Sequence, residues 1–345
     1  MQQAINISTR GIGLTWPNPS VGCIIVKQNL IIGRGVTQVG GRPHAEQVAL
    51  EMAGDKAKNS TVYVSLEPCC HTGVTAPCAD ALIQAGVKRV VIASLDPDKR
   101  VSGSGLMRLK KAGIDVISGI LEKEAREVNE GYFKSRNESL PYVTLKVAVT
   151  VDSKTATYSG DSHWITNRGA RQHSHMLRAR HDVIIVSSST AISDNPELTC
   201  RLPGMKKYSP TRVLLDAFRK APNSLKLFKN IDEIPLWIFT SLPKNDPINQ
   251  ESIKLGAKVV NVPNDSLGYG LDLTAVFKEL VGLGITRVMV ESGSQLSSAL
   301  FQEKLVDKLV VYRAPSLIGG DGLSLMAGIN LKKISESIRL KLDDI

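Results

Sequence analysis

Short apolar runs alternate with segments of helical periodicity along the first 140 residues. The apolar runs, rich in β-branched residues, predict strands at 21–26, 61–66 and 89–94. Between and after them, helices are predicted at 45–54, 78–86 and 103–112. This alternation is typical of an α/β sandwich with parallel strands.

A charged helix is predicted over 122–136, and the residues Asn137-Glu138-Ser139-Leu140-Pro141 then interrupt the helical pattern. This interruption is the expected linker between two domains, 1–140 and 141–345. The 345 residues of the chain suffice for two domains of ordinary size.

The second half begins with an extended run at 142–149, and later apolar runs predict further strands. These strands are expected at 183–186, 212–216, 236–240, 258–262, 287–291 and 309–313. Helices are expected at 168–180, 273–283 and 295–303. The second half is therefore predicted to be another α/β domain with its own core.

The composition, 42% hydrophobic and 22% charged, is typical of a globular protein. No apolar run approaches the roughly 18 residues of a membrane span, and no secretory signal is recognisable at the N-terminus. We therefore expect a cytoplasmic protein without a membrane partner. The formal charge of +10 fits an anionic small substrate, phosphate cofactors or nucleic acid, and equally an ordinary basic surface. The basic residues form no long run, which argues against nucleic acid.

Candidate chemistry lies in His44-Ala45-Glu46, followed by Glu67-Pro68-Cys69 and Cys78. The zinc deaminases carry H-x-E followed by P-C-x-x-C, although here the second cysteine comes nine positions after the first. A zinc ion bound by His44, Cys69 and Cys78 would keep its fourth position for water, whose pKa it lowers to about 7. Glu46 would take the water proton, pass it to a ring nitrogen, and finally deliver a proton to departing ammonia.

Local sequence places these residues at helix starts. Pro43 is expected in the first turn of a helix that carries His44 and Glu46, and Pro77-Cys78 is expected to open the next helix. The five cysteines, three of them within 69–78, do not suggest a disulfide framework.

Two alternatives remain for these residues. One is a closed structural site with Cys70 as the fourth ligand, and the other is an ordinary core without metal. Adjacent cysteines seldom reach one tetrahedral metal together, and a structural site has no use for Glu46. The open site is therefore favoured.

With the motifs around them, these residues resemble the bifunctional riboflavin-biosynthesis deaminase–reductase family over nearly the whole chain. The matching segments of the first half are 18–22, 43–46, 67–69, His71 and Cys78. Those of the second half are Asp152, 159–162, 164–166, 194–196, 198–199, Arg201 and Glu291.

The resemblance implies a cytidine-deaminase-like α/β/α sandwich followed by a dihydrofolate-reductase-like α/β domain. The first domain would use zinc to remove the C2 amine of 2,5-diamino-6-ribosylamino-4(3H)-pyrimidinone 5′-phosphate. The second would use NADPH to reduce the ribosyl group, giving 5-amino-6-ribitylamino-uracil 5′-phosphate. A homo-oligomer is also implied. No G-x-G-x-x-G follows a strand in the second half, so a Rossmann site is not expected.

The resemblance also assigns residues. Asn18 would bind the pyrimidine, with a simple turn role as the alternative, and His71 would lie near the ribose phosphate. The substrate of the reductase would meet Ser162, Arg178, Leu198, Arg201 and Glu291. The cofactor would meet Ala148, Trp164, Thr190, Asp194, Ala217, Gly293, Ser294, Gln295, Leu296, Ser297, Ser298 and Ala299. Without the resemblance, Arg178 would be read as a solvated helix residue and Trp164 as a core aromatic.

The sequence departs from the family pattern at Val74, Asp98 and Ser104, where a lost cation and a gained carboxylate should weaken phosphate binding. Lys99 or Arg100 would compensate. Asp152-Ser153 replaces an Asp-Gly turn, so a positive φ is expected at Ser153. The chain stops at Ile345, short of a last strand usual in the family, and a more open sheet edge is expected.

Two rival functions remain at this point. A nucleic-acid deaminase would bind oligonucleotides in a salt-dependent way. A non-catalytic zinc module with a degenerate reductase would hold its metal with four protein ligands.

Overall fold

The structure is a computed structural model that describes all residues except 72–75, 100, 163–164 and 344–345. Two compact units are present. The first comprises Met1–Tyr142, Arg180–Asp182 and Leu280–Arg287, and the second comprises Val143–Ala179, Val183–Glu279 and Val288–Ile345. The expected domain boundary after residue 140 falls between helix α6 (Glu130–Glu138) and strand β6 (Tyr142–Thr150).

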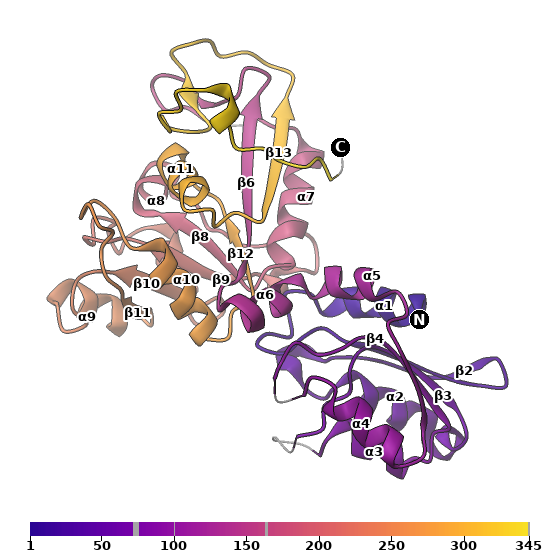
Figure 1. Cartoon of the computed structure of the whole chain (residues 1–345). Helices are drawn as coiled ribbons and strands as arrows, with labels where there is room; N and C mark the ends of the chain where they lie inside the picture. The colour runs from indigo at the N-terminus through magenta and orange to yellow at the C-terminus, as the bar shows by residue number, and fades with distance from the viewer. Residues whose placement is uncertain (72–75, 100, 163–164, 344–345) are drawn as a thin grey trace. The chain divides into compact units, whose positions relative to one another are not determined.

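The first unit is built on a five-stranded sheet of order β2-β1-β3-β4-β5 (Figure 1). Its strands are β1 (Gly22–Lys27), β2 (Leu30–Val36), β3 (Thr61–Leu66), β4 (Arg89–Ser94) and β5 (Asp115–Ser118). β3, β4 and β5 are parallel, whereas β1 is antiparallel to both β2 and β3. The expectation of parallel strands is therefore wrong for β1, and β2 was not predicted. Only Gln28 and Asn29, both with positive φ, join these two strands, and so short a connection requires an antiparallel pair.

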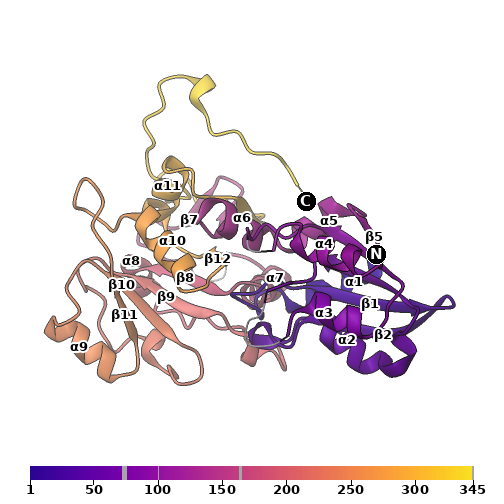
Figure 2. The same cartoon turned by 60° about the horizontal axis from the view of Figure 1, so that its bottom comes forward.

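Helices cover both faces of this sheet, as Figures 1 and 2 show. One face carries α1 (Gln2–Ser8) and α5 (Glu122–Val128), and the other carries α2 (Ala45–Ala53), α3 (Cys78–Gln84) and α4 (Ser104–Lys111). Fully buried residues of α2, α3 and α4 share one core with the alternate apolar residues of β1, β3 and β4. The predicted three-layer sandwich is confirmed.

The helix predicted over 122–136 is instead two helices, α5 and α6, separated at Asn129. The Asn129 side chain accepts a hydrogen bond from the Ser20 N–H at 2.8 Å and donates one to the Ser20 carbonyl at 2.9 Å. This pairing with a distant backbone holds Asn129 outside helical geometry, so the single-helix prediction is wrong. The predicted linker is also shorter than expected, because α6 continues to Glu138.

The second unit contains a seven-stranded sheet of order β11-β10-β9-β8-β12-β6-β13. Besides β6, its strands are β8 (Val183–Ser187), β9 (Thr211–Leu215), β10 (Leu236–Thr240), β11 (Lys258–Asn261), β12 (Arg287–Val290) and β13 (Lys308–Ala314). β7 (Lys154–Ala156) and β14 (Leu323–Ser324) form a separate pair. The helices are α7 (Arg168–Ala179), α8 (Ser188–Asp194), α9 (Pro247–Lys254), α10 (Leu273–Gly282) and α11 (Ser294–Gln302).

The predicted strands and helices of the second half are all present, with ends that differ by at most two residues. The predictions omitted α1, β2, β5, β7, α8, α9 and β14. Among the residues that the structure describes, six short 3₁₀ helices are also present: Thr9–Gly11, Val39–Gly41, Gly54–Ala57, Lys206–Tyr208, Lys226–Phe228 and Ile334–Glu336.

Two smaller findings concern the chain as a whole. Ser153 has φ 61°, as the Asp152-Ser153 turn predicts. Within the part of the chain that the structure describes, no helix combines the length and the apolar character needed to cross a membrane.

Strand β2 and helix α2 approach so closely that a side chain is excluded at Gly35. A Cβ at Gly35 would overlap the carbonyl oxygen of Ala45 and the backbone nitrogen of Ala49. We expect Gly35→Ala to lower the free energy of unfolding by about 3 kcal/mol, because backbone cannot move aside as a side chain can. Denaturant unfolding followed by circular dichroism measures this.

The matched control for this substitution is Gly282→Ala at the end of α10, where an added Cβ meets no atom within 4 Å. This control should be neutral or should stabilise the protein by up to about 0.5 kcal/mol. Equal stability of the Gly35→Ala protein and the wild type would contradict the close approach.

Candidate active sites

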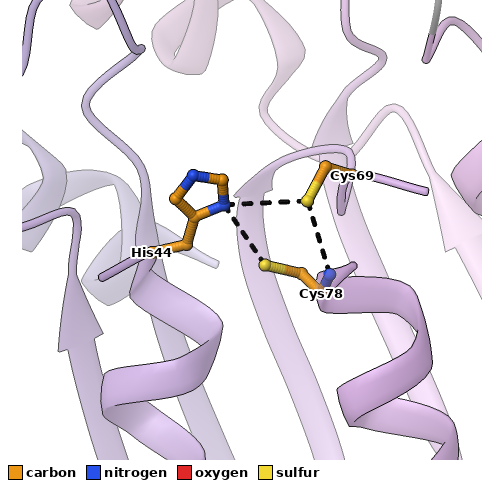
Figure 3. Close-up of side chains that lie close together, drawn as sticks. All are labelled: His44, Cys69 and Cys78. Atoms are coloured by element: carbon orange, nitrogen blue, oxygen red, sulfur yellow. Dashed lines mark hydrogen bonds between the residues drawn. The ribbon is translucent and has the colours of Figure 1, made fainter. Parts of the chain in front are cut away.

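Three elements of the first unit carry the predicted metal ligands to one place. His44 is the N-cap of α2, Cys78 is the first residue of α3, and Cys69 lies in the turn after β3. The His44 ring and both sulfur atoms point toward one another in Figure 3. Pro43 precedes the helix instead of lying in its first turn, so that expectation is wrong by two positions, since Ala45 is the first helical residue.

The distances suit a shared ion. His44 Nδ1 lies 3.3 Å from Cys78 Sγ and 3.7 Å from Cys69 Sγ, and the three ligand atoms all lie within 4.8 Å of one another. One imidazole nitrogen and two sulfurs at this spacing form the donor set that zinc prefers in tetrahedral sites. The residues present therefore fit a zinc ion.

Local hydrogen bonds favour ionised sulfur. The Cys78 side chain donates to Cys69 and lowers the pKa of Cys69 to about 4, and the Cys78 backbone N–H lies 3.4 Å from the same sulfur. The pKa of Cys78 is raised in return. The two thiols thus share one proton when no cation is bound, and a dication would displace that proton.

Glu46 lies in the first turn of α2, two residues after His44, and is only 3% exposed. Burial, with the charge of Cys69, raises the pKa of Glu46 to about 7. Interaction with Cys78 partly opposes this rise. Glu46 is therefore near the three ligand atoms without being one of them.

Cys70 does not join the cluster. Among the described residues, the only group of His, Cys, Asp or Glu with metal-ligand spacing is His44, Cys69 and Cys78. The Cys70 side chain is half-buried, and its pKa is raised by burial and by the charge of Glu67. The closed four-ligand alternative thus has no geometric support in this part of the chain.

The two predicted substrate residues of this site flank its ligands. Asn18 Nδ2 donates to the carbonyl of Gly41 at 3.2 Å, three residues before His44. His71, two residues after Cys69, has a buried Nδ1 without a hydrogen-bond partner among the described residues. Its imidazole therefore retains hydrogen-bonding capacity for a ligand.

Glu67, which the sequence analysis left without a role, anchors the turn that carries Cys69. Its buried carboxylate accepts hydrogen bonds from the backbone N–H groups of Asp96 at 3.2 Å, Gly103 at 2.9 Å and Leu106 at 3.0 Å. Three bonds to segment 96–106 fix the position of that segment relative to the metal ligands. The only sequence signal for this role was the position of an acidic residue directly before Pro68-Cys69.

The departures from the family pattern have different outcomes. The Asp98 carboxylate lies 3.9 Å from Arg136 Nε and is largely buried, so its charge is offset within the protein. The expected repulsion of a substrate phosphate by Asp98 is therefore reduced. Ser104 is the first residue of α4. Its hydroxyl is uncharged, so this position does not supply the cation that is common there in the family. Val74 and Arg100 lie outside the described residues.

The second unit contains a pocket of about 450 Å³ at the carboxyl ends of β8 and β12 and beside β6, which we call the reductase pocket. Ligands of open α/β sheets bind at such strand ends. Nine of the predicted residues line it: Ala148, Ser162, Arg178, Thr190, Asp194, Leu198, Arg201, Glu291 and Gly293.

The remaining predicted cofactor residues lie elsewhere. Ser294, Gln295, Leu296, Ser297, Ser298 and Ala299 belong to α11, which starts at the pocket edge after Gly293, and Ser297 and Ser298 are buried. Ala217 follows β9, where its carbonyl accepts a hydrogen bond from Ser241. Trp164 lies outside the described residues.

A buried charge cluster forms one wall of the reductase pocket. Arg178 donates two hydrogen bonds to Glu291, at 2.7 and 2.9 Å, and Lys146 donates a third at 3.1 Å. Burial alone would raise the pKa of Glu291, but Arg178 and Lys146 outweigh burial and hold that pKa well below its usual range. Arg178 is thus buried in an ion pair and is no solvated helix residue.

Lys146 is a pocket residue that the sequence analysis missed. The sequence signal for Lys146 was that it is the one charged residue of β6. His175 was missed as well: it lines the pocket, and its Nδ1 lies 3.0 Å from the Thr199 carbonyl and 3.3 Å from the Arg201 N–H. Burial and the charges of Arg178 and Arg201 lower the pKa of His175, so a neutral imidazole faces the pocket.

Two domain families match this chain. Residues 1–94 match the cytidine and deoxycytidylate deaminase zinc-binding region, and residues 141–345 match the RibD C-terminal domain. The fold and the two sites thus define an enzyme that joins a zinc-type deaminase to an NADPH-type reductase.

Relatives match over the full length. The riboflavin biosynthesis protein RibD of Aquifex aeolicus is 40% identical over 99% of this chain and 92% of its own length. That of Escherichia coli is 38% identical over 100% of this chain and 95% of its own. The chain belongs to the RibD family, the bifunctional deaminase–reductases of riboflavin biosynthesis.

Solved structures agree with this membership. Acinetobacter baumannii RibD has a TM-score of 0.90 at 38% identity, covering 100% of this chain and 93% of that one. A diaminohydroxyphosphoribosylaminopyrimidine deaminase/5-amino-6-(5-phosphoribosylamino)uracil reductase from Thermotoga maritima has a TM-score of 0.87 at 31% identity, with the same coverage. The predicted fold class, enzyme class and cofactors, zinc and NADPH, are confirmed at family level.

The Glu67 anchor can be tested by one isosteric change. We expect Glu67→Gln to lower the free energy of unfolding by about 1–3 kcal/mol, because an amide NH₂ replaces one acceptor and faces N–H donors. The loosened segment 96–106 should also raise the KM of ammonia release while bound zinc stays at one per chain. Denaturant unfolding, metal analysis and the ammonia assay measure these effects.

The control is Glu124→Gln, which removes an exposed carboxylate of the same unit. It should leave the free energy of unfolding and KM unchanged. Equal behaviour of the Glu67 and Glu124 variants would show that Glu67 holds nothing in place.

Proposed function

We propose that residues 1–140 deaminate 2,5-diamino-6-ribosylamino-4(3H)-pyrimidinone 5′-phosphate and that residues 141–345 then reduce its ribosyl group to ribityl. The observation that supports the deaminase assignment best is the approach of His44, Cys69 and Cys78 beside the buried Glu46 carboxylate. That arrangement offers three metal ligands and a separate proton carrier.

In the deaminase site, His44, Cys69 and Cys78 would hold zinc. When bound, zinc acts as a Lewis acid and makes a water molecule acidic enough to react at neutral pH. Glu46 would take one proton from the water and pass it to a ring nitrogen, and would then take the second proton from the hydroxyl added to the ring carbon and deliver it to the departing amine. Asn18, held by Gly41, would hydrogen-bond the pyrimidine edge, and His71 would face the ribose phosphate.

In the reductase site, NADPH supplies the hydride when it is bound. Arg201 would bind the substrate phosphate, together with the N–H groups of Arg178 that Glu291 and Thr199 leave free. Ser162 and Leu198 would complete that subsite, and Glu291 would orient the ribose. The cofactor would lie against Ala148, Trp164, Thr190, Asp194, Ala217 and residues 293–299.

We further propose a cytoplasmic homo-oligomer whose partner is the phosphorylated pyrimidine and not nucleic acid or a membrane. All five cysteines are free, as suits a reducing compartment. The nucleic-acid rival gives no role to the reductase half, which matches a family model over its whole length. The rival with a degenerate reductase is disfavoured by the charged, well-formed pocket around Glu291.

A paired assay on the purified protein tests both activities separately. Ammonia release from the substrate should proceed without NADPH, and NADPH oxidation should begin on addition of the deaminated intermediate. A zinc chelator should stop ammonia release and leave NADPH oxidation intact. Chelator-resistant ammonia release would contradict the assignment of the first site.

Glu46→Gln should lower the rate of ammonia release by about 10²–10⁴-fold, because the amide cannot carry a proton. Bound zinc and NADPH oxidation should not change, since the ligands and the second unit are untouched. Glu51→Gln, an exposed carboxylate on the same helix, is the control and should behave as the wild type. Wild-type ammonia release by the Glu46 variant would remove Glu46 from the reaction.

Arg201→Ala should raise the KM of the reductase reaction by about 10–100-fold, the effect of losing one charged hydrogen bond, with kcat nearly constant. Ammonia release should be unchanged. The control is Arg313→Ala, an exposed arginine on β13 outside the pocket lining. Steady-state kinetics with the deaminated intermediate measure KM and kcat. An unchanged KM would exclude Arg201 from the phosphate subsite.

A further inference from the structure

A second cavity of about 430 Å³, which we call the basic pocket, lies in the same unit as the reductase pocket. Its charged lining residues are Arg201, Lys206, Arg212, Lys226, Lys229 and a single carboxylate, Glu197. Segment 197–201 contributes to both cavities: Leu198 lines the reductase pocket, Thr199 and Cys200 line the basic pocket, and Arg201 lines both. Apart from Arg201, no residue that lines the basic pocket has a binding role in the functions proposed above.

Arg212 gives this pocket its unusual character. It is the second residue of strand β9, is 1% exposed, and is the largest fully buried side chain of the described residues. Its guanidinium donates to the carbonyl of Lys229 at 3.1 Å and to that of Ile234. Its Nε–H, also buried, has no acceptor among the described residues.

The surrounding charges do not compensate Arg212. No ion pair of Arg212 occurs among the described residues, and Glu197 is the only acidic residue that acts on its pKa. Burial lowers that pKa to about 10, so the guanidinium still carries its charge at neutral pH. Glu197 itself lies 3.5 Å from Arg201, and Lys206 is paired with Glu233 at 2.7 Å.

Lys226 and Lys229 add two exposed ammonium groups at the rim of this cavity, and no ion pair of either is found among the described residues. A buried cation without a counter-charge is unfavourable, and an anion held between it and these lysines would relieve that cost. Guanidinium and ammonium groups together are the usual donors to phosphate.

We propose that the basic pocket is a second anion-binding site, which takes a small phosphate-bearing ligand between Arg212 and the lysines Lys226 and Lys229. Because Arg201 lines both cavities, such a ligand would compete with the substrate phosphate of the reductase for this guanidinium. The cavity has the size of small-molecule sites, so a phosphorylated metabolite fits it better than a macromolecule.

The test is isothermal titration calorimetry of the full-length protein with inorganic pyrophosphate. The Lys226→Ala/Lys229→Ala protein is compared with the wild type and with Lys244→Ala/Lys254→Ala, which removes two exposed lysines of the same unit outside the pocket. All three proteins keep the reductase pocket, so pyrophosphate bound there contributes equally. All four exchanged lysines are at the surface, and folding should not be affected.

We expect one binding component of the wild type to weaken about tenfold or more in the Lys226/Lys229 variant and to persist in the control. NADPH oxidation measured without pyrophosphate should be the same in all three proteins. Identical isotherms for the wild type and the Lys226/Lys229 variant would overturn the proposal. Equal weakening in both variants would also overturn it, because it would indicate only a response to net charge.

Discussion

The deaminase half depends on one constraint: a nitrogen and two sulfurs from distant parts of the chain must meet within 4.8 Å. Two helix starts and one turn carry these atoms, so the positions of α2, α3 and the Cys69 turn decide whether a metal can bind. Gly35 lets α2 lie directly on β2, and Glu67 ties the Cys69 turn to segment 96–106. Both features fix the backbone of the segments that carry the metal ligands. A small shift of that backbone would therefore move the ligand atoms as well.

The reductase half depends on a different interaction, a buried carboxylate shared by two cations. Glu291 accepts three hydrogen bonds from Arg178 and Lys146 at the wall of the pocket. Breaking such a group leaves an unpaired buried charge, which costs about 3–5 kcal/mol. The cluster therefore keeps its geometry before any ligand arrives, and the phosphate subsite that we propose depends mainly on the more exposed Arg201.

Local patterns predicted most helices and strands and the three metal ligands, because apolar periodicity and cap residues act within a few positions. They could not predict contacts that join distant segments. Asn129 leaves the helical pattern to bond Ser20, Asp98 is offset by Arg136, and Glu67 holds residues about 30 to 40 positions away. The family resemblance supplied the reductase residues. Lys146 and His175 could be identified only from the structure, which places both in the pocket lining.

X-ray absorption at the zinc edge of the purified protein tests the central claim most directly. The account predicts two sulfur ligands at about 2.3 Å and two lighter ligands at about 2.0 Å, one of them the His44 nitrogen and the other from solvent. Three sulfur ligands, with Cys70 closing the coordination shell, would contradict it.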